Sequence, residues 1–214
     1  MRREQLALYL VTDRGLSLGR DLVWVVEEAV RGGVGIVQLR EKEVDTREFI
    51  ELGQRLLEVL KPAGVPLLIN DRVDVALAIG ADGVHIGQSD MPYDIARRLL
   101  GPDKIIGLSV ENMDEVREAE VLDVDYIAVS PVYSTATKTD TAPPFGLGGL
   151  REAVRLTSHP AVAIGGMNER TAADAYATGV DGLAVVSAIC SAPSPADAAA
   201  RLRTIYLSGR RSMP

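Results

Sequence analysis

The chain has 214 residues, of which 47% are hydrophobic and 25% are charged, and its formal net charge is −7. This composition is typical of a soluble globular protein, and the acidic balance argues against a broad nucleic-acid-binding surface, which would be basic. No apolar run approaches the roughly 18 residues of a membrane span, and no signal-peptide pattern begins the chain. One cysteine, Cys190, excludes an internal disulfide and is typical of a reducing compartment. We therefore expect a cytoplasmic protein.

Short apolar segments alternate with helical patterns along the whole chain. The first half predicts strand 6–13, helix 21–33, strand 36–42, helix 46–64, strand 66–71, helix 72–79, strand 83–87 and helix 92–100. The second half predicts strand 104–110, helix 113–122, strand 125–132, helix 148–157, strand 160–167, helix 168–179, strand 182–189 and helix 194–207. Helix ends are expected at Gly32–Gly33 and Pro62, and helix starts at Thr46 and Asn168.

This order of elements predicts an α/β fold with parallel strands joined by right-handed crossovers. Eight strand–helix units indicate closure into a single (β/α)8 TIM barrel of small size. An open doubly wound sheet is the alternative, but it would be unusually wide. Because there is no linker or shift in composition, we expect one barrel domain at 1–207 and a disordered C-terminal tail at 208–214.

In such a barrel, function is assembled at the carboxyl ends of the strands. In "VQLREK" the side chains of Gln38, Arg40 and Lys42 share one face, since side chains alternate along a strand. Two cations and an amide that point into the barrel mouth favour an anion site. The alternative is a surface strand end with a solvated arginine and lysine.

The next two strands bring carboxylates to the same rim. "LLINDR" contains Asn70 and Asp71, and "GVHIGQSD" ends at Asp90. Two neighbouring carboxylates repel each other unless a cation intervenes, and a bound Mg²⁺ that bridges them to a diphosphate resolves the conflict. The alternative, which spacing alone leaves equally open, is that each aspartate caps a following helix. His85 lies within a strand and is expected to be a satisfied core histidine.

The later strands end in hydroxyl and glycine residues. Strand 104–110 carries Ser109, and the loop "STATKTD" presents Thr135, Thr137 and Lys138 as donors for a phosphate. The segment "PPFGLGG" supplies stiff and flexible joints for a lid that excludes water on closing. A long disordered surface loop is the alternative. Gly165–Gly166 and Ser187 lie where small barrels often hold a phosphate, although a tight turn would also explain the glycine pair. The layout suits an enzyme that joins a phosphorylated molecule to a diphosphorylated one.

Seven segments in this order, "YLVTD", "VQLREK", "LLINDR", "DGVHIGQSD", "STATKTD", "AIGGM" and "GLAVVSAI", resemble thiamine-phosphate synthases over about residues 8–203. The resemblance implies condensation of a pyrimidine methyl diphosphate with a hydroxyethylthiazole phosphate, which gives thiamine phosphate and releases diphosphate. Nucleic-acid and membrane partners are not expected, and a homo-oligomer is compatible with the sequence. Two residues depart from the family pattern. Many relatives have glycine in place of Ser130, and isoleucine is commoner in place of Met167; the sequence does not decide what either change does.

The resemblance also implies the site residues. The pyrimidine diphosphate would bind Gln38, Arg40, Lys42, Asn70, Ser109 and Lys138; Mg²⁺ would bind Asp71 and Asp90; the thiazole phosphate would bind Thr135, Thr137, Gly166, Val186 and Ser187. The expected catalytic groups are Arg40, Lys42, Ser109 and Lys138, which stabilise the departing diphosphate. The thiazole nitrogen attacks with a lone pair and needs no base. A dissociative step through a carbocation-like species is expected, because the electron-rich aminopyrimidine can delocalise the positive charge.

Three alternatives remain open from the sequence. A thiazole tautomerase would lack the aspartate pair and the threonine–lysine loop. A sugar-phosphate isomerase or lyase would need a proton-transfer pair, for which His85 is the one weak candidate. A non-catalytic phosphate-binding barrel would bind thiazole phosphate without dependence on Mg²⁺.

Overall fold

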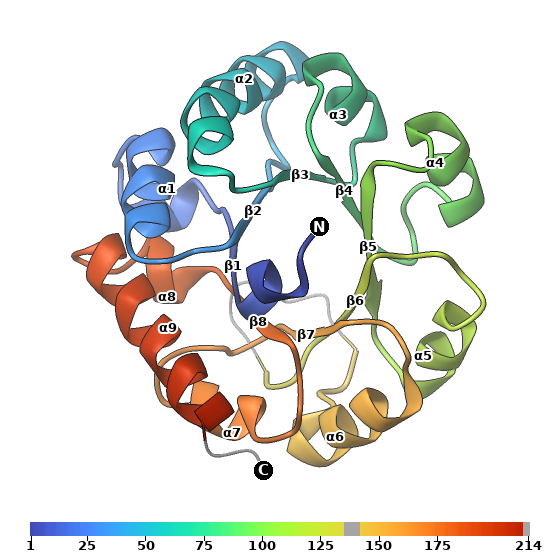
Figure 1. Ribbon diagram of the computed structural model, residues 1–214. Coiled ribbons are helices and arrows are strands. Elements are labelled where there is room, and N and C mark those ends of the chain that lie inside the picture. The colour runs from blue at the N-terminus through green and yellow to red at the C-terminus, as the bar shows by residue number, and fades with distance from the viewer. Residues whose placement is uncertain (135–141, 212–214) are drawn as a thin grey trace.

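The computed structural model describes residues 1–134 and 142–211. Its eight parallel strands close into a barrel in chain order, with helices around the outside (Figure 1). Pairing of Leu8 with Leu183 joins the first strand to the last, which confirms the (β/α)8 barrel and rules out the open sheet. The strands are β1 (Leu8–Val11), β2 (Ile36–Leu39), β3 (Leu67–Asn70), β4 (Gly83–Ile86), β5 (Ile105–Val110), β6 (Tyr126–Val129), β7 (Ala161–Ala163) and β8 (Gly182–Val185).

The helices follow the strands in alternation. Two 3₁₀ helices, η1 (Arg3–Ala7) and η2 (Gly15–Ser17), lie before and after β1. The α-helices are α1 (Leu22–Arg31), α2 (Thr46–Ala63), α3 (Val73–Ile79), α4 (Tyr93–Leu100), α5 (Met113–Ala119), α6 (Gly146–Leu156), α7 (Ala172–Tyr176), α8 (Ser187–Cys190) and α9 (Pro195–Arg211). None of these described helices has the length and hydropathy that crossing a membrane requires.

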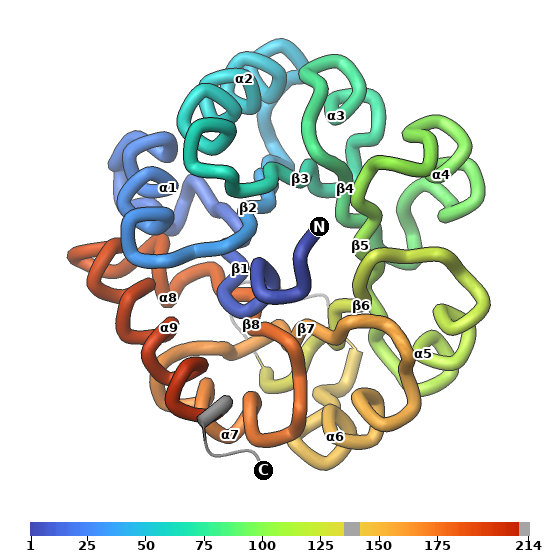
Figure 2. The backbone as a smooth tube through the Cα atoms, viewed as in Figure 1, coloured from blue at the N-terminus to red at the C-terminus, as the bar shows by residue number. Residues whose placement is uncertain are grey.

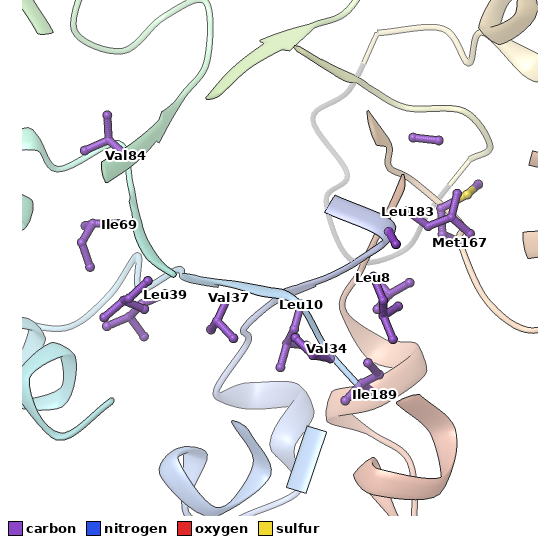
Figure 3. Packing of buried hydrophobic residues seen from close by; sticks show 14 of the residues in the cluster. Leu8, Leu10, Val34, Val37, Leu39, Ile69, Val84, Met167, Leu183 and Ile189 are labelled. Carbon is purple, nitrogen blue, oxygen red and sulfur yellow. The ribbon is translucent and has the colours of Figure 1, made fainter. Parts of the chain in front are cut away.

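Side-chain alternation along the strands divides the buried residues into two clusters. Leu8, Leu10, Val37 and Leu39 point outward and pack against the helices (Figure 3). The intervening positions face the barrel axis and form a smaller inner cluster: Leu6, Tyr9, Val11, Ile36, Leu68, Ile105, Tyr126, Ala128, Val162 and Ala184. The period of two that the sequence shows therefore decides which side chains can reach the barrel interior.

The amino-terminal end of the barrel is closed by η1, which lies across the centre of the ring in Figures 1 and 2. Leu6 is fully buried in the inner cluster. Arg3 donates from Nε to Oδ1 of Asp181 at 2.5 Å, just before β8. A Cβ atom on Gly182 would lie 1.7 Å from the Leu6 carbonyl oxygen, so only glycine allows this close approach.

Two boundaries of α2 differ from those that the sequence predicts. Asp45, rather than Thr46, is the N-cap, because its Oδ1 accepts a hydrogen bond from the Glu48 backbone N–H at 2.9 Å. Pro62 lies in the last turn and does not end the helix. The helix ends instead at Gly64, which adopts φ +65°, a left-handed conformation that glycine accepts without strain.

The last quarter of the chain also departs from the predicted boundaries. Asn168 does not begin a helix: residues 168–171 form a turn in which the Asn168 N–H donates to Thr171 Oγ1, and α7 begins at Ala172. The apolar run 182–189 divides into β8 and the short α8, because Val186 leaves the extended conformation. Helix α9 continues past 207 to Arg211, so residues 208–211 are helical, whereas 212–214 lie outside the described residues.

Candidate active site

A cavity of about 650 Å³ opens at the carboxyl ends of the strands. Most of the predicted site residues line it, although they come from positions up to 149 residues apart: Gln38, Arg40, Lys42, Asn70, Asp71, Asp90, Ser109, Gly166, Val186 and Ser187. Thr135, Thr137 and Lys138 lie outside the described residues, so the predicted loop donors have no structural description here.

The segment from β2 carries an amide and two cations along one edge of the cavity. Gln38 is 3% exposed and faces the barrel interior, as its parity predicts. The backbone N–H of Arg40 donates to Thr12 Oγ1 at 3.1 Å, and its guanidinium lies 3.9 Å from Asp13. Lys42 donates from Nζ to Oδ2 of Asp71. Both Arg40 and Lys42 line the cavity and are partly exposed. Lys42 is half exposed, but it also pairs with Asp71, so it is not simply a solvated surface residue.

The carboxyl groups of Asp71 and Asp90 are close enough to interact electrostatically. Burial, together with this interaction, raises the pKa of Asp90. Asp90 Oδ2 also accepts from the Gly87 N–H at 2.7 Å. Neither aspartate caps a helix, since α3 and α4 both begin without a side-chain cap. The capping alternative is therefore wrong, and the two carboxyls form one acidic group beside Lys42.

Asp71 reaches this position through an unusual backbone conformation. Its φ is +61°, in the left-handed region that aspartate tolerates better than most residues. The turn is held by the Arg72 N–H, which donates to Asn70 O at 2.7 Å, and by the Asp71 N–H, which donates to His85 O. This backbone geometry carries the chain from β3 to α3 and leaves the Asp71 carboxyl at the cavity edge.

A chain of buried polar side chains crosses the barrel below the cavity. Gln38 Nε2 donates to Tyr9 Oη at 2.6 Å, and Tyr9 Oη lies 2.8 Å from Tyr126 Oη. Tyr126 Oη is 2.8 Å from His85 Nδ1, and His85 Nε2 is 2.8 Å from Ser109 Oγ. Burial lowers the pKa of His85 to about 4, so the ring is neutral at neutral pH. His85 is a satisfied core histidine, as the sequence predicts.

The opposite side of the cavity is formed by the ends of β7 and β8. Gly165 and Gly166 have φ of +97° and +70°, so the turn alternative is correct. They also permit close packing: a Cβ on Gly166 would lie 2.8 Å from Cβ of Tyr133. Gly166 and Ser187 line the cavity. The glycine pair therefore serves the turn and the cavity wall together.

Several cavity residues are absent from the sequence-based set. Gln88 donates from Nε2 to the Ser109 carbonyl oxygen at 2.6 Å, and Glu111, Ser130 and Asn168 also line the cavity. Each lies within two residues of a predicted site residue or at a strand end, which is the signal that could have found them. Tyr9 and Tyr126 were missed because each stands in an apolar run as one inward-facing residue among many.

Fold and cavity together define the class: a (β/α)8 barrel with a polar binding site at the carboxyl ends of its strands, where acidic and basic side chains meet. The family described as thiamine monophosphate synthase matches residues 8–189 of the chain. The chain belongs to this family.

Relatives with known names share most of the sequence. Thiamine-phosphate synthase of Albidiferax ferrireducens is 54% identical over 205 residues, which cover 96% of this chain and 94% of the relative. Thiamine-phosphate synthase of Vibrio parahaemolyticus is 56% identical over 198 residues, covering 92% and 97%. These relatives match the chain over nearly its whole length.

Solved structures agree at the level of the fold. Thiamine phosphate pyrophosphorylase from Pyrococcus furiosus is similar with a TM-score of 0.89 and 40% sequence identity, covering 97% of this chain and 98% of the other. A 3-hexulose-6-phosphate synthase has a TM-score of 0.69 at 17% identity, covering 93% and 99%. The second likeness shows only that the barrel is shared.

Proposed function

We propose that this chain is a thiamine-phosphate synthase that joins 4-amino-2-methyl-5-(diphosphooxymethyl)pyrimidine to 4-methyl-5-(2-phosphooxyethyl)thiazole. One observation carries the proposal: the neighbouring carboxyls of Asp71 and Asp90 meet Lys42 at the mouth of a cavity that Arg40 also lines. Family membership and the names of the relatives support the same activity.

The reaction replaces a carbon–oxygen bond by a carbon–nitrogen bond. The bond from the pyrimidine methylene to the diphosphate oxygen breaks, and its electron pair leaves with diphosphate. The thiazole ring nitrogen then supplies its lone pair to the methylene carbon. Neither step removes a proton, so the absence of a nucleophile–base pair from the predicted catalytic set agrees with this chemistry. The electron-rich aminopyrimidine can carry the positive charge between the two steps.

The task of the protein is to stabilise the departing diphosphate. Arg40 and Lys42 provide fixed positive charge at the cavity edge, and Ser109 offers a hydroxyl from β5. Charged donors that are already in place where negative charge develops are the most effective stabilisers of such a transition state. Lys138 would add a further cation from the loop, and this assignment remains a prediction from sequence.

Mg²⁺ suits the Asp71–Asp90 pair. The two carboxyls are neighbours and repel each other when both are charged, so a divalent cation between them would remove that repulsion. Mg²⁺ in proteins commonly takes one or two carboxylates and fills its other positions with phosphate oxygens and water. Among the described residues no group of three or more metal-binding side chains competes for this role. When bound, Mg²⁺ would neutralise charge on the diphosphate.

The second substrate would occupy the β7–β8 side of the cavity. Gly166, Val186 and Ser187 line that side, and a backbone without a Cβ at Gly166 lets a phosphate come close. Thr135 and Thr137 would complete the site from the loop. The two phosphorylated groups would then approach from opposite walls, which leaves the reacting carbon and nitrogen between them.

Other attributes in this proposal rest on sequence alone. A cytoplasmic location follows from the single cysteine and the biosynthetic role. Nucleic-acid and membrane partners are not part of the proposal, and the oligomeric state stays open.

The test is incubation of the purified protein with both substrates and Mg²⁺, with diphosphate release and thiamine phosphate followed separately. Release of both in equal amounts, lost without Mg²⁺ or without the thiazole phosphate, is expected. Isomerisation of the thiazole without diphosphate release would instead identify a tautomerase. Thermal stabilisation by thiazole phosphate with no product would identify a non-catalytic barrel.

A further inference from the structure

The polar chain inside the barrel ends at two predicted substrate-binding residues, Gln38 and Ser109. Its three middle members, Tyr9, Tyr126 and His85, have no assigned role. Their side chains come from β1, β6 and β4, and all three are at least 93% buried. Three buried polar groups in line between two binding residues are costly to maintain unless every hydrogen has an acceptor.

With the Gln38 amide nitrogen toward Tyr9, one direction gives every hydrogen between Gln38 and Ser109 an acceptor within the chain. Gln38 Nε2 donates to Tyr9 Oη, and within the polar chain the hydrogen of Tyr9 then has only Tyr126 Oη to accept it. Tyr126 must then donate to His85 Nδ1. An imidazole that accepts at Nδ1 carries its hydrogen on Nε2, so Nε2 donates to Ser109 Oγ. The Ser109 hydroxyl hydrogen is therefore free to point into the cavity.

A doubly protonated His85 does not fit this arrangement. Its Nδ1 would donate to Tyr126 Oη, which already receives the hydrogen of Tyr9. The hydrogen of Tyr126 would then lack an acceptor within the chain. With Gln38 as the donor at the other end, the hydrogen-bond partners therefore select the neutral ring with its hydrogen on Nε2.

The surroundings hold the middle of the chain rigidly. Tyr126 packs edge-on against Tyr9, with ring centroids 5.8 Å apart, and stacks on His85 at 5.6 Å. Gly107 makes room for it, because a Cβ there would lie 2.1 Å from Tyr126 Cζ. Because these contacts fix the ring of Tyr126, its hydroxyl can leave Nδ1 of His85 only if the whole ring moves out of the barrel interior.

We propose that Tyr9, Tyr126 and His85 are positioning residues that fix the Ser109 hydroxyl as a hydrogen-bond donor toward the substrate. The inference rests on the proposed function for the identity of that substrate. The ligand atom that faces Ser109 must then be an acceptor. The pyrimidine diphosphate offers two kinds, a ring nitrogen and a phosphate oxygen, and both can accept the hydrogen of the Ser109 hydroxyl.

The first experiment reads the direction of the chain in the protein without ligand. The sequence contains two histidines, His85 and His159, so ¹⁵N labelling of histidine gives two imidazole patterns. His85 is expected as a single neutral tautomer with hydrogen on Nε2, assigned by comparison with His85→Gln. Hydrogen on Nδ1, or a mixture of tautomers, would overturn the proposal. This readout does not depend on the reaction.

The second experiment breaks the chain at its centre. Tyr126→Phe keeps the ring and removes the hydroxyl, so His85 loses its Nδ1 donor and its tautomer becomes mixed. The matched control is Tyr176→Phe, which also removes a buried hydroxyl, here one that donates to Ala7 O at 2.5 Å, outside the polar chain. Comparable melting temperatures in the two variants would show that any further difference is not general destabilisation.

Binding to each variant is measured with two probes. Inorganic diphosphate with Mg²⁺ has phosphate oxygens and no ring, whereas 4-amino-5-hydroxymethyl-2-methylpyrimidine has the ring and no phosphate. Tyr126→Phe is expected to weaken binding of at least one probe by about tenfold relative to Tyr176→Phe, and the affected probe identifies the acceptor. Equal affinities for both probes in the two variants would overturn the proposal.

The two proposals fail separately. A wild-type protein that makes no thiamine phosphate but shows the Nε2 tautomer contradicts the proposed function and leaves the hydrogen-bond direction standing. A wild-type protein that is active but carries the hydrogen on Nδ1 contradicts only the positioning role. If Tyr126→Phe fails to fold, the tautomer measured in the wild-type protein still decides the question.

Discussion

Lys42 Nζ donates a hydrogen bond to Asp71 Oδ2, which joins the end of the β2 segment to the end of β3. The same carboxyl group lies near that of Asp90 and helps to raise its pKa. Asp71 is thus the shared member of a cation–carboxyl–carboxyl group, and its side chain is 20% exposed toward the cavity. Removing its charge should disturb the diphosphate half of the site more than the thiazole half, because Gly166 and Ser187 lie on the other wall.

Asp71→Asn is expected to lower kcat by about 100-fold, because the variant loses a charge that holds Mg²⁺ near the leaving group. Affinity for thiazole phosphate should change by less than about twofold. Steady-state kinetics and calorimetry measure the two quantities. The matched control is Asp74→Asn, which removes an exposed carboxylate paired with Arg72 and should leave both unchanged. Equal losses in turnover and thiazole phosphate binding would show that Asp71 does not serve the diphosphate.

Lys138→Ala is expected to slow a single turnover by about 100-fold while the melting temperature changes by less than about 2 °C. The reason is that a cation on the loop would stabilise the leaving diphosphate and would contribute little to the stability of the fold. Lys104→Ala provides the contrast, because Lys104 Nζ donates to Ala81 O at 2.6 Å and stabilises the barrel. That variant should melt earlier and keep its turnover. A large drop in melting temperature for Lys138→Ala would make the lysine structural.

His85 should make stability depend on pH. Burial lowers its pKa from the ordinary 6.5 to about 4, so between these values the unfolded chain binds a proton that the folded chain does not. The stabilising contribution is therefore complete above pH 6.5 and is lost as the pH falls toward 4. From pH 7 to pH 5 the loss is about 2 kcal/mol.

Urea unfolding at pH 7 and pH 5 measures this effect. His85→Gln should lose less stability than the wild-type protein between these two values, because glutamine does not titrate. His159→Gln is the control: His159 Nε2 lies 3.1 Å from the Ala119 carbonyl oxygen, outside the barrel interior, and this variant should keep the wild-type pH dependence. The same pH dependence in His85→Gln as in the wild-type protein would contradict the assignment.

Cys190 should resist thiol reagents in the folded protein. It is fully buried, and burial raises the pKa of its thiol to about 11. Since the thiolate is the reactive form, reaction with Ellman's reagent at pH 8 should be at least about 100-fold slower than in urea-unfolded protein. Complete reaction of the folded protein within minutes would mean that the α8 region opens readily.

Much of the fold was predictable because it depends on alternation that a single sequence displays. The strand–helix order predicted the barrel, and the parity of Gln38 predicted its inward direction. The split of 182–189 into β8 and α8 was not predictable, because the apolar run continues unbroken through Val186 and only the backbone at that residue turns.

The candidate site divides in the same way. Rim position predicted that Asp71 and Asp90 would be neighbours, since carboxyl ends of adjacent strands meet. The left-handed conformation of Asp71 and its pairing with Lys42 depend on tertiary contacts that residue type does not reveal. The path from Gln38 to Ser109 depends on five strands whose relative register becomes known only when the barrel closes.

The seal that η1 forms beneath the barrel has a kinetic consequence. The amino-terminal end is blocked by Leu6 and the Arg3–Asp181 pair, so molecules enter and leave the cavity only at the carboxyl-terminal end of the barrel. Both substrates and both products use that opening. The molecule that binds deepest must enter first and leave last. The closed amino-terminal end therefore imposes an order on substrate binding and product release.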